Sequence, residues 1–101
     1  MPSAYIIVDM NISNMELYKH YMAAAPAAVA AAGGEYLVRG GKFDVLEGDW
    51  KPGRIAMLKF PSFDAAKAFY DGELYRAART KREGATEFFN MVLVEGVAVT
   101  A

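Results

Sequence analysis

The sequence contains no cysteine and only one histidine, His20. Without cysteine the chain forms no disulfide, offers no thiolate nucleophile and cannot bind zinc through sulfur. One histidine cannot build a multi-histidine metal site within a single chain. We therefore expect neither a metal ion nor another cofactor.

An excess of charge of one sign and a long hydrophobic run are also lacking. Eleven Lys and Arg residues against twelve Asp and Glu residues give a net charge of -1, so there is no basic field for nucleic acid. The longest weakly polar run, residues 22–34, is mostly alanine and contains Pro26, so it falls short of the ~20 apolar residues that span a bilayer. The first residues lack the basic region of a signal peptide. We expect a cytoplasmic protein that contacts neither nucleic acid nor membrane.

Hydrophobic residues are plentiful, at 54% of 101 residues. A chain of this length supports one core and is too short for two. No linker or low-complexity segment divides it. We predict a single domain over residues 1–101.

The first half of the chain predicts a strand, a helix and a second strand. Residues 4–10 are β-branched and aromatic, as in a buried strand. Ser13 and Glu16 form a capping-box pattern that starts a helix, which ends at Gly33-Gly34. Pro26 should kink or break this helix near Ala25 and leave a polar group exposed around Met22. The buried face is expected to consist of Leu17, Tyr21, Ala24, Ala28 and Ala32.

Residues 35–47 have a strand pattern, with Gly40-Gly41 as a bulge or, less favoured, a tight turn. Glycine, proline and aspartate in residues 48–53 predict a connection. The rest of the pattern predicts a strand over residues 54–60, a helix capped by Ser62, a second helical segment over 73–82, a strand over 86–95 and a β-prone tail over 97–100.

This order, strand-helix-strand-strand-helix-strand, is that of an α+β, ferredoxin-like βαββαβ fold with a four-stranded antiparallel sheet. Right-handed crossovers place both helical regions on one face of the sheet. Nevertheless, both faces of the strands are apolar: Ile6 and Val8 alternate with Tyr5 and Ile7. The open face therefore predicts a homodimer formed through the sheet.

Several short segments together resemble the family called domain of unknown function 1330, of the dimeric α/β-barrel superfamily. They are Ala25-Pro26, residues 33–41, 46–50 and 52–54, Phe60-Pro61-Ser62, Tyr75 and Arg82. The chain departs from the family pattern at Lys59, at Phe69 and at Gly72-Glu73. The resemblance covers residues 4–96 and implies a dimeric α/β barrel without an established reaction. The wider superfamily includes cofactor-independent monooxygenases, small isomerases, haem-dependent members and ligand-sensing domains.

His20 is the natural candidate for a general base or an axial haem ligand, although its place at the edge of the helical stripe also suits a surface residue. Tyr18 and Tyr21, three residues apart, either point into a cavity between helix and sheet or simply pack there. Tyr75 and Arg82 share one face of the later helix. Arg79 lies on the same face. A solvated, salt-bridged face is favoured there, and the alternatives are a nucleic-acid surface and the closing of a pocket.

Arg39 and Arg54 lie on predicted strands and need partners, because an unpaired buried charge is very costly. Asp44 and Glu47 would make structural ion pairs with them; the alternative is an anionic ligand. Asp9 has the same two interpretations, with turn formation favoured. Trp50 is expected to cover a dimer edge or a pocket mouth.

Three functional hypotheses follow. The first is a cytoplasmic homodimer that binds a small, partly apolar or anionic molecule through Tyr18, Tyr21, Arg39, Arg54, Tyr75 and Arg82. The second is a cofactor-independent monooxygenase or isomerase with His20 as the catalytic base. The third is a structural or regulatory dimer module without a ligand.

Overall fold

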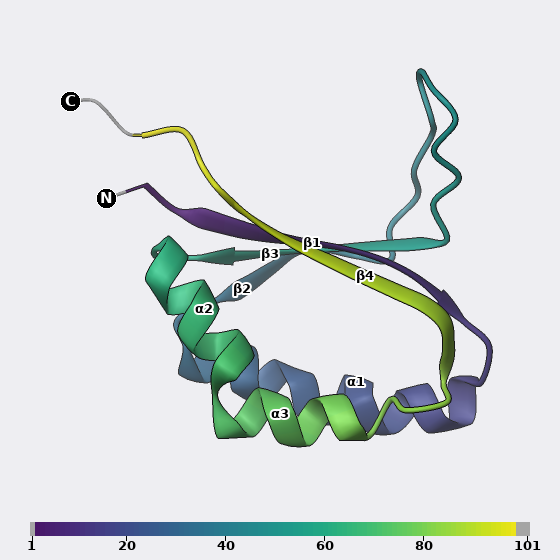
Figure 1. The fold of residues 1–101 in the computed structure, drawn as a ribbon, viewed down its shortest axis with the longest axis horizontal. Coiled ribbons are helices and arrows are strands. Elements are labelled where there is room, and N and C mark those ends of the chain that lie inside the picture. The colour runs from purple at the N-terminus through teal and green to yellow at the C-terminus, as the bar shows by residue number, and fades with distance from the viewer. Residues whose placement is uncertain (1, 99–101) are drawn as a thin grey trace.

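The computed structural model describes residues 2–98 of the chain (Figure 1). Its elements are β1 (Ala4–Ile12), α1 (Met15–Ala31), β2 (Glu35–Arg39), β3 (Arg54–Phe60), α2 (Phe63–Asp71), α3 (Glu73–Thr80) and β4 (Thr86–Glu95). The predicted order and α+β class are confirmed.

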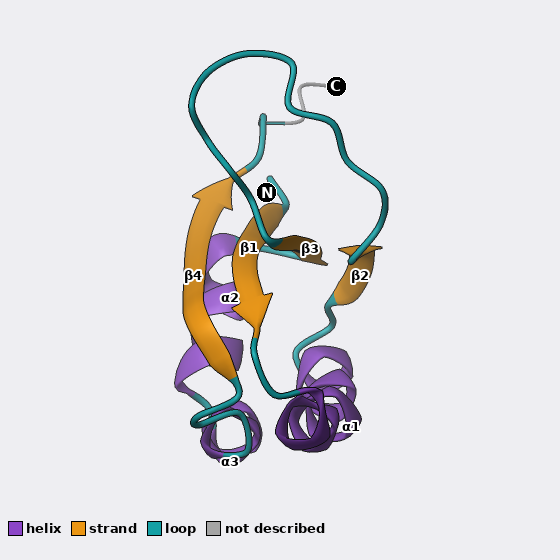
Figure 2. Cartoon of the chain, turned by 90° about the vertical axis from the view of Figure 1, so that its right-hand side faces the viewer, coloured by secondary structure: helices purple, strands orange, loops and turns teal. Residues whose placement is uncertain are grey.

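The four strands form one antiparallel sheet in the order β2-β3-β1-β4, the ferredoxin-like topology predicted from the sequence. All three helices lie on one side of this sheet, and the loop between β2 and β3 projects on the other side (Figures 1 and 2). A pocket between sheet and helices is therefore built from elements that are distant in sequence.

The helix-facing side of the sheet forms the core. Along β1 buried residues alternate with half-buried ones, and Ala4, Ile6, Val8 and Met10 are the buried set. The opposite face stays partly uncovered and apolar, with Val92 59% exposed and Val94 45% exposed on β4. The expectation of two apolar faces with helices on only one of them is met.

Helix α1 begins one residue later than predicted. Its N-cap is Asn14, whose Oδ1 accepts a hydrogen bond from the backbone N–H of Leu17 at 3.2 Å, so the Ser13 cap was wrong. The backbone N–H groups of Ser13 and Asn14 both donate to the carbonyl of Ala85, at 2.9 and 3.0 Å. This attachment to the start of β4 keeps Ser13 outside the helix.

The buried face of α1 is also displaced by one residue at its start. The structure buries Tyr18, Tyr21, Ala25, Ala28 and Val29 and leaves Leu17 39% exposed. Tyr18 takes the buried position because its hydroxyl reaches the core at Met10. The predicted stripe was therefore right at Tyr21 and Ala28 and wrong at Leu17.

Pro26 does not break α1, which is continuous from Met15 to Ala31. Proline cannot donate to the carbonyl four residues earlier, and that carbonyl, on Met22, instead accepts a hydrogen bond from Arg39 Nη2 at 3.3 Å. The polar group expected around Met22 is thus present, and a side chain from β2 satisfies it.

The strand predicted over residues 35–47 ends at Arg39, and residues 41–53 form a loop without helix or strand. The bulge favoured at Gly40-Gly41 is absent; the register of β2 shifts instead between Tyr36 and Val38. Gly40 has φ 74°, a left-handed conformation suited to glycine. Since β3 begins only at Arg54, no neighbouring strand is available to pair with residues 41–47.

The second half of the chain matches the predictions closely. Strands β3 and β4 have the predicted bounds, and Ser62 Oγ caps α2 by accepting from the N–H of Ala65 at 3.0 Å. Helix α3 ends at Thr80 rather than residue 82. Of the predicted tail, residues 97–98 have no regular structure and residues 99–100 lie outside the described part.

Candidate functional site

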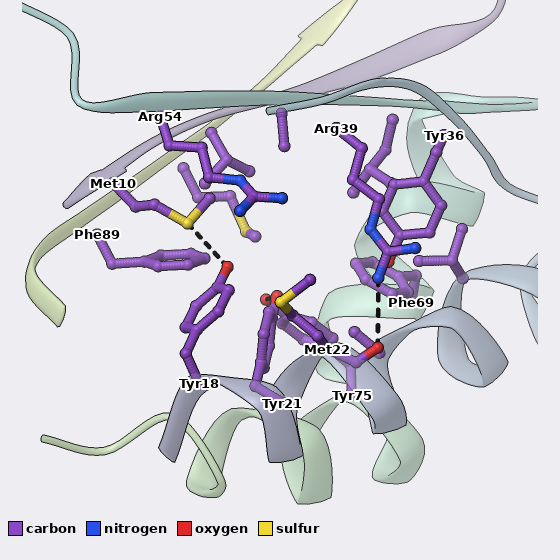
Figure 3. Close-up of a pocket in the computed structure, with 16 residues that line it drawn as sticks. Met10, Tyr18, Tyr21, Met22, Tyr36, Arg39, Arg54, Phe69, Tyr75 and Phe89 are labelled. Atoms are coloured by element: carbon purple, nitrogen blue, oxygen red, sulfur yellow. Dashed lines mark hydrogen bonds between the residues drawn. The ribbon is translucent and has the colours of Figure 1, made fainter. Parts of the chain in front are cut away.

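A cavity of about 40 Å³ lies between the sheet and the helices (Figure 3). Most of its wall is apolar and comes from β1, β3, β4 and α1, with Val8, Met10, Val29, Leu58, Phe89 and Met91 among the lining residues. The space holds a few water molecules or a small organic group. Drug-sized ligands need a pocket of roughly 300 Å³ or more, so this cavity is too small for them.

Three tyrosine hydroxyls enter the cavity from the helical side. Tyr18 donates its hydroxyl proton to Met10 Sδ at 2.8 Å. The hydroxyls of Tyr21 and Tyr75 are 2.7 Å apart and hydrogen-bonded, joining α1 to α3. The sequence-predicted set Tyr18, Tyr21 and Tyr75 is therefore brought together at one cavity.

Tyr18 and Tyr21 stay protonated near neutral pH. Burial raises the pKa of Tyr18 to about 12, against the opposing effect of the positive charge of Arg54. Burial also raises the pKa of Tyr21, and the neighbouring Tyr75 hydroxyl adds to the rise. At neutral pH these two hydroxyls are therefore hydrogen-bond donors and poor bases.

Two arginines face the cavity from the sheet. The β2 irregularity at Leu37 places both Tyr36 and Arg39 on the inner face, opposite Leu58 and Ala56 respectively; in a regular strand, residues three apart would point to opposite faces. The Arg39 guanidinium lies 4.6 Å from the centre of the Tyr36 ring and points toward Met22 (Figure 3).

Arg54, the first residue of β3, extends into the cavity from the other side (Figure 3). A Cβ at Gly40 would lie 2.5 Å from Arg54 Nε. Gly40 therefore leaves the room that the Arg54 side chain occupies, in addition to taking the positive φ at the end of β2.

Neither of these arginines has a carboxylate partner in the part of the chain that the structure describes. Within residues 2–98 the one ion pair is Lys19–Glu16, at 3.6 Å on the exposed surface of α1. Asp44 and Glu47, the expected partners, lie in the exposed loop. The interpretation of Arg39 and Arg54 as members of structural ion pairs with these two residues was wrong.

His20 and Arg82 are not lining residues of the cavity. His20 is exposed on α1. The Arg82 guanidinium lies 3.6 Å from the ring centre of Phe89 and 5.4 Å from that of Tyr21, and its buried Nε has no hydrogen-bond partner. Arg82 thus packs on two rings that line the cavity without lining it itself.

Asp9 anchors the loop between β2 and β3. One carboxylate oxygen accepts from Trp50 Nε1 at 2.9 Å and the other from the N–H of Gly53 at 2.8 Å. The favoured turn-forming role was wrong, because Asp9 lies within β1 and its carboxylate instead binds a distant loop. Trp50 remains 56% exposed and does not line the cavity.

Sequence reasoning missed Tyr36, Met22 and Phe89 as lining residues. Tyr36 was missed because the sequence of Glu35–Arg39 contains no signal of the register shift that turns the Tyr36 side chain toward the cavity. The Met22 carbonyl did have a signal, which was Pro26 four residues later.

Residues 2–98 contain no group of three or more His, Asp or Glu side chains placed to hold a metal ion. None of the helices described has the length and apolar character needed to cross a membrane.

Residues 3–97 match the family described as a domain of unknown function, number 1330. The chain belongs to this family. Among curated proteins there is no match. Membership establishes the fold and relationship predicted from the short segments, and the family description assigns no reaction.

Solved structures with this fold include a protein of unknown function from Rhodopseudomonas palustris, 16% identical, with a TM-score of 0.76 over 97% of this chain and 85% of that one. A dimeric ferredoxin-like protein of unknown function from Jannaschia is 15% identical, with a TM-score of 0.67 over 95% and 99% of the two chains. A cofactor-independent oxygenase from Streptomyces nogalater is 10% identical, with a TM-score of 0.64 over 98% and 97%. Identities this low establish a shared fold alone.

Proposed function

We propose that this member of the family binds a small organic anion, a carboxylate with a short apolar portion, in the cavity between α1 and the sheet. The observation that carries the proposal is that Arg39 and Arg54 face one apolar cavity and have no carboxylate partner within residues 2–98. A guanidinium in such surroundings is stabilised by an anion, and its planar donors match a carboxylate.

The positive charge and the hydrogen-bond donors of the cavity wall complement an anion. Its lining residues include two arginines and four tyrosines, and no acidic side chain. Arg54 is half-buried and Arg39 is exposed, and partial desolvation strengthens the attraction of Arg54 for a negative charge. The apolar wall provides the contacts for a short hydrocarbon group.

We also propose that the protein is a homodimer through the open face of the sheet. Ile7 and Met57 lie on this face beside the exposed Val92 and Val94, and a partner would cover them. Ferredoxin-like proteins from Thermobifida fusca, Jannaschia and Bacteroides fragilis that share this fold are dimeric.

Ligand binding is favoured over the other two hypotheses. Two fold neighbours are a cofactor-independent oxygenase and a protein assigned as an antibiotic biosynthesis monooxygenase. The monooxygenase or isomerase hypothesis, however, needs His20 as its base, and His20 is exposed outside the cavity. A module without a ligand leaves unexplained why Arg54 extends into the cavity without a carboxylate partner among the described residues. Residence in the cytoplasm stays a prediction from the sequence.

Butyrate and its neutral amide, butyramide, test the proposal. Titration followed by NMR shifts of the protein is expected to show butyrate binding in preference to butyramide. Arg54→Met should weaken butyrate binding about tenfold, the effect of losing one charge-assisted hydrogen bond.

The matched control is Arg76→Met, which removes an exposed arginine from α3 and should leave binding unchanged. Equal binding of acid and amide, or equal losses in both variants, would refute the proposal.

A further inference from the structure

The paired hydroxyls of Tyr21 and Tyr75 contain one proton more than their hydrogen bond uses. Two hydroxyls carry two protons, and the 2.7 Å contact between them engages only one. No other hydrogen bond of either hydroxyl is present among the described residues. One of the two O–H groups is therefore a donor without an acceptor among the described residues.

This spare donor is buried. The exposed fractions of Tyr21 and Tyr75 are 9% and 1%, and both residues line the cavity that Arg39 and Arg54 face. Buried donors in folded proteins are almost always paired, so this one indicates an acceptor in the cavity that the chain itself does not supply.

Tyr18 differs from the pair in this respect. Its hydroxyl proton already has an acceptor, Met10 Sδ at 2.8 Å. The Met22 carbonyl is likewise engaged, by Arg39. Of the three hydroxyls on the helical side, the donor without an acceptor thus belongs to the Tyr21–Tyr75 pair.

We infer that the ligand is an oxo-carboxylate, whose carboxylate is bound by the arginines and whose carbonyl oxygen accepts the spare proton of the Tyr21–Tyr75 pair. This inference rests on the proposed function and specifies its ligand class. The arginines and the tyrosine pair line the same cavity of about 40 Å³, so the inference places one small ligand in contact with both. A carbonyl suits the site because it only accepts, and the lining side chains contain no carboxylate or imidazole to accept from a ligand hydroxyl.

The test compares 2-oxobutyrate with butyrate, which has the same carbon chain and charge but no carbonyl. In the wild-type protein 2-oxobutyrate should bind roughly threefold to tenfold more tightly, the effect of one added hydrogen bond. The double variant Tyr21→Phe/Tyr75→Phe removes both hydroxyls and should abolish this preference.

Tyr18→Phe is the matched control, since it removes a cavity hydroxyl whose proton is already engaged, and it should retain the preference. Loss of the preference in Tyr18→Phe, or its survival in the double variant, would overturn the inference. A second measurement needs no variant: the infrared carbonyl stretch of bound 2-oxobutyrate should move to lower frequency, and an unshifted band would also overturn it.

The two proposals fail in distinguishable ways. Equal, Arg54-dependent binding of 2-oxobutyrate and butyrate would overturn the oxo-carboxylate inference and leave the anion site standing. Binding of neither acid would refute the anion site itself.

Discussion

Pro26 affects the site through an atom four residues away. It removes the donor that would pair with the Met22 carbonyl, and Arg39 provides a replacement at 3.3 Å. The same hydrogen bond holds the Arg39 guanidinium beside the cavity. One missing backbone N–H thereby orients a charged side chain from another element.

Tyr18 should make folding stability depend on alkaline pH. Its pKa is raised from 10.0 to about 12 by burial, so the folded state holds the proton more tightly than the unfolded state does. The resulting stability is fully present below pH 10 and is lost as the pH rises toward 12, by roughly 2 kcal/mol.

Urea unfolding of the wild type and of Tyr18→Phe at pH 7 and across pH 10 to 12 would check this expectation. The variant should lose less of its free energy of unfolding over the alkaline range. Parallel losses in the two proteins would show that Tyr18 does not contribute.

At the scale of elements, two serines of similar sequence context have different roles. Ser62 caps α2 through its side chain, whereas Ser13 precedes α1 and leaves the cap to Asn14. Both positions fit a local cap pattern. The difference comes from Ala85, which binds the backbone of Ser13 and is 72 positions away in sequence.

Ser62→Ala and Asn14→Ala should each reduce the free energy of unfolding by about 1 kcal/mol, because each removes a side-chain acceptor from a helix N-terminus. Ser13→Ala should change it by less than about 0.5 kcal/mol. Chemical denaturation of the three variants checks the order. A Ser13→Ala loss as large as that of Asn14→Ala would contradict this assignment of the cap.

Local patterns predicted the elements whose limits are set locally. Strands β3 and β4 and the start of α2 follow from apolar runs and a cap. The end of β2 was missed because it depends on where β3 begins, and Tyr36 was missed because its direction depends on pairing with β3. The sequence identified three of the cavity tyrosines and both arginines by type. That the arginines have no carboxylate partner among the described residues became visible only in three dimensions.

At the scale of the whole molecule, the two sides of the sheet are unequal. Helices cover one side, while the other presents Val92 and Val94 and the projecting loop, whose Leu46 is 88% exposed (Figure 2). Exposed apolar surface of this extent is uncommon on monomers.

Sedimentation at micromolar concentration should give twice the 11.0 kDa chain mass for the wild type. Val92→Glu places a charge on the open sheet face and should shift the equilibrium toward monomer. Leu74→Glu is the matched control, since Leu74 is 56% exposed on α3 against 59% for Val92, and should leave the mass unchanged. A wild-type species of 11.0 kDa would refute the dimer.

The central strand β1 pairs with β3 on one side and with β4 on the other, and its Ala4 lies opposite Glu95. During synthesis β1 leaves the ribosome first, yet its second neighbour is the last strand made. At roughly 5–20 residues per second, β1 therefore waits several seconds with an unpaired edge. Any protection that the nascent chain needs should concentrate on β1 during this interval, and the sheet closes only once β4 emerges.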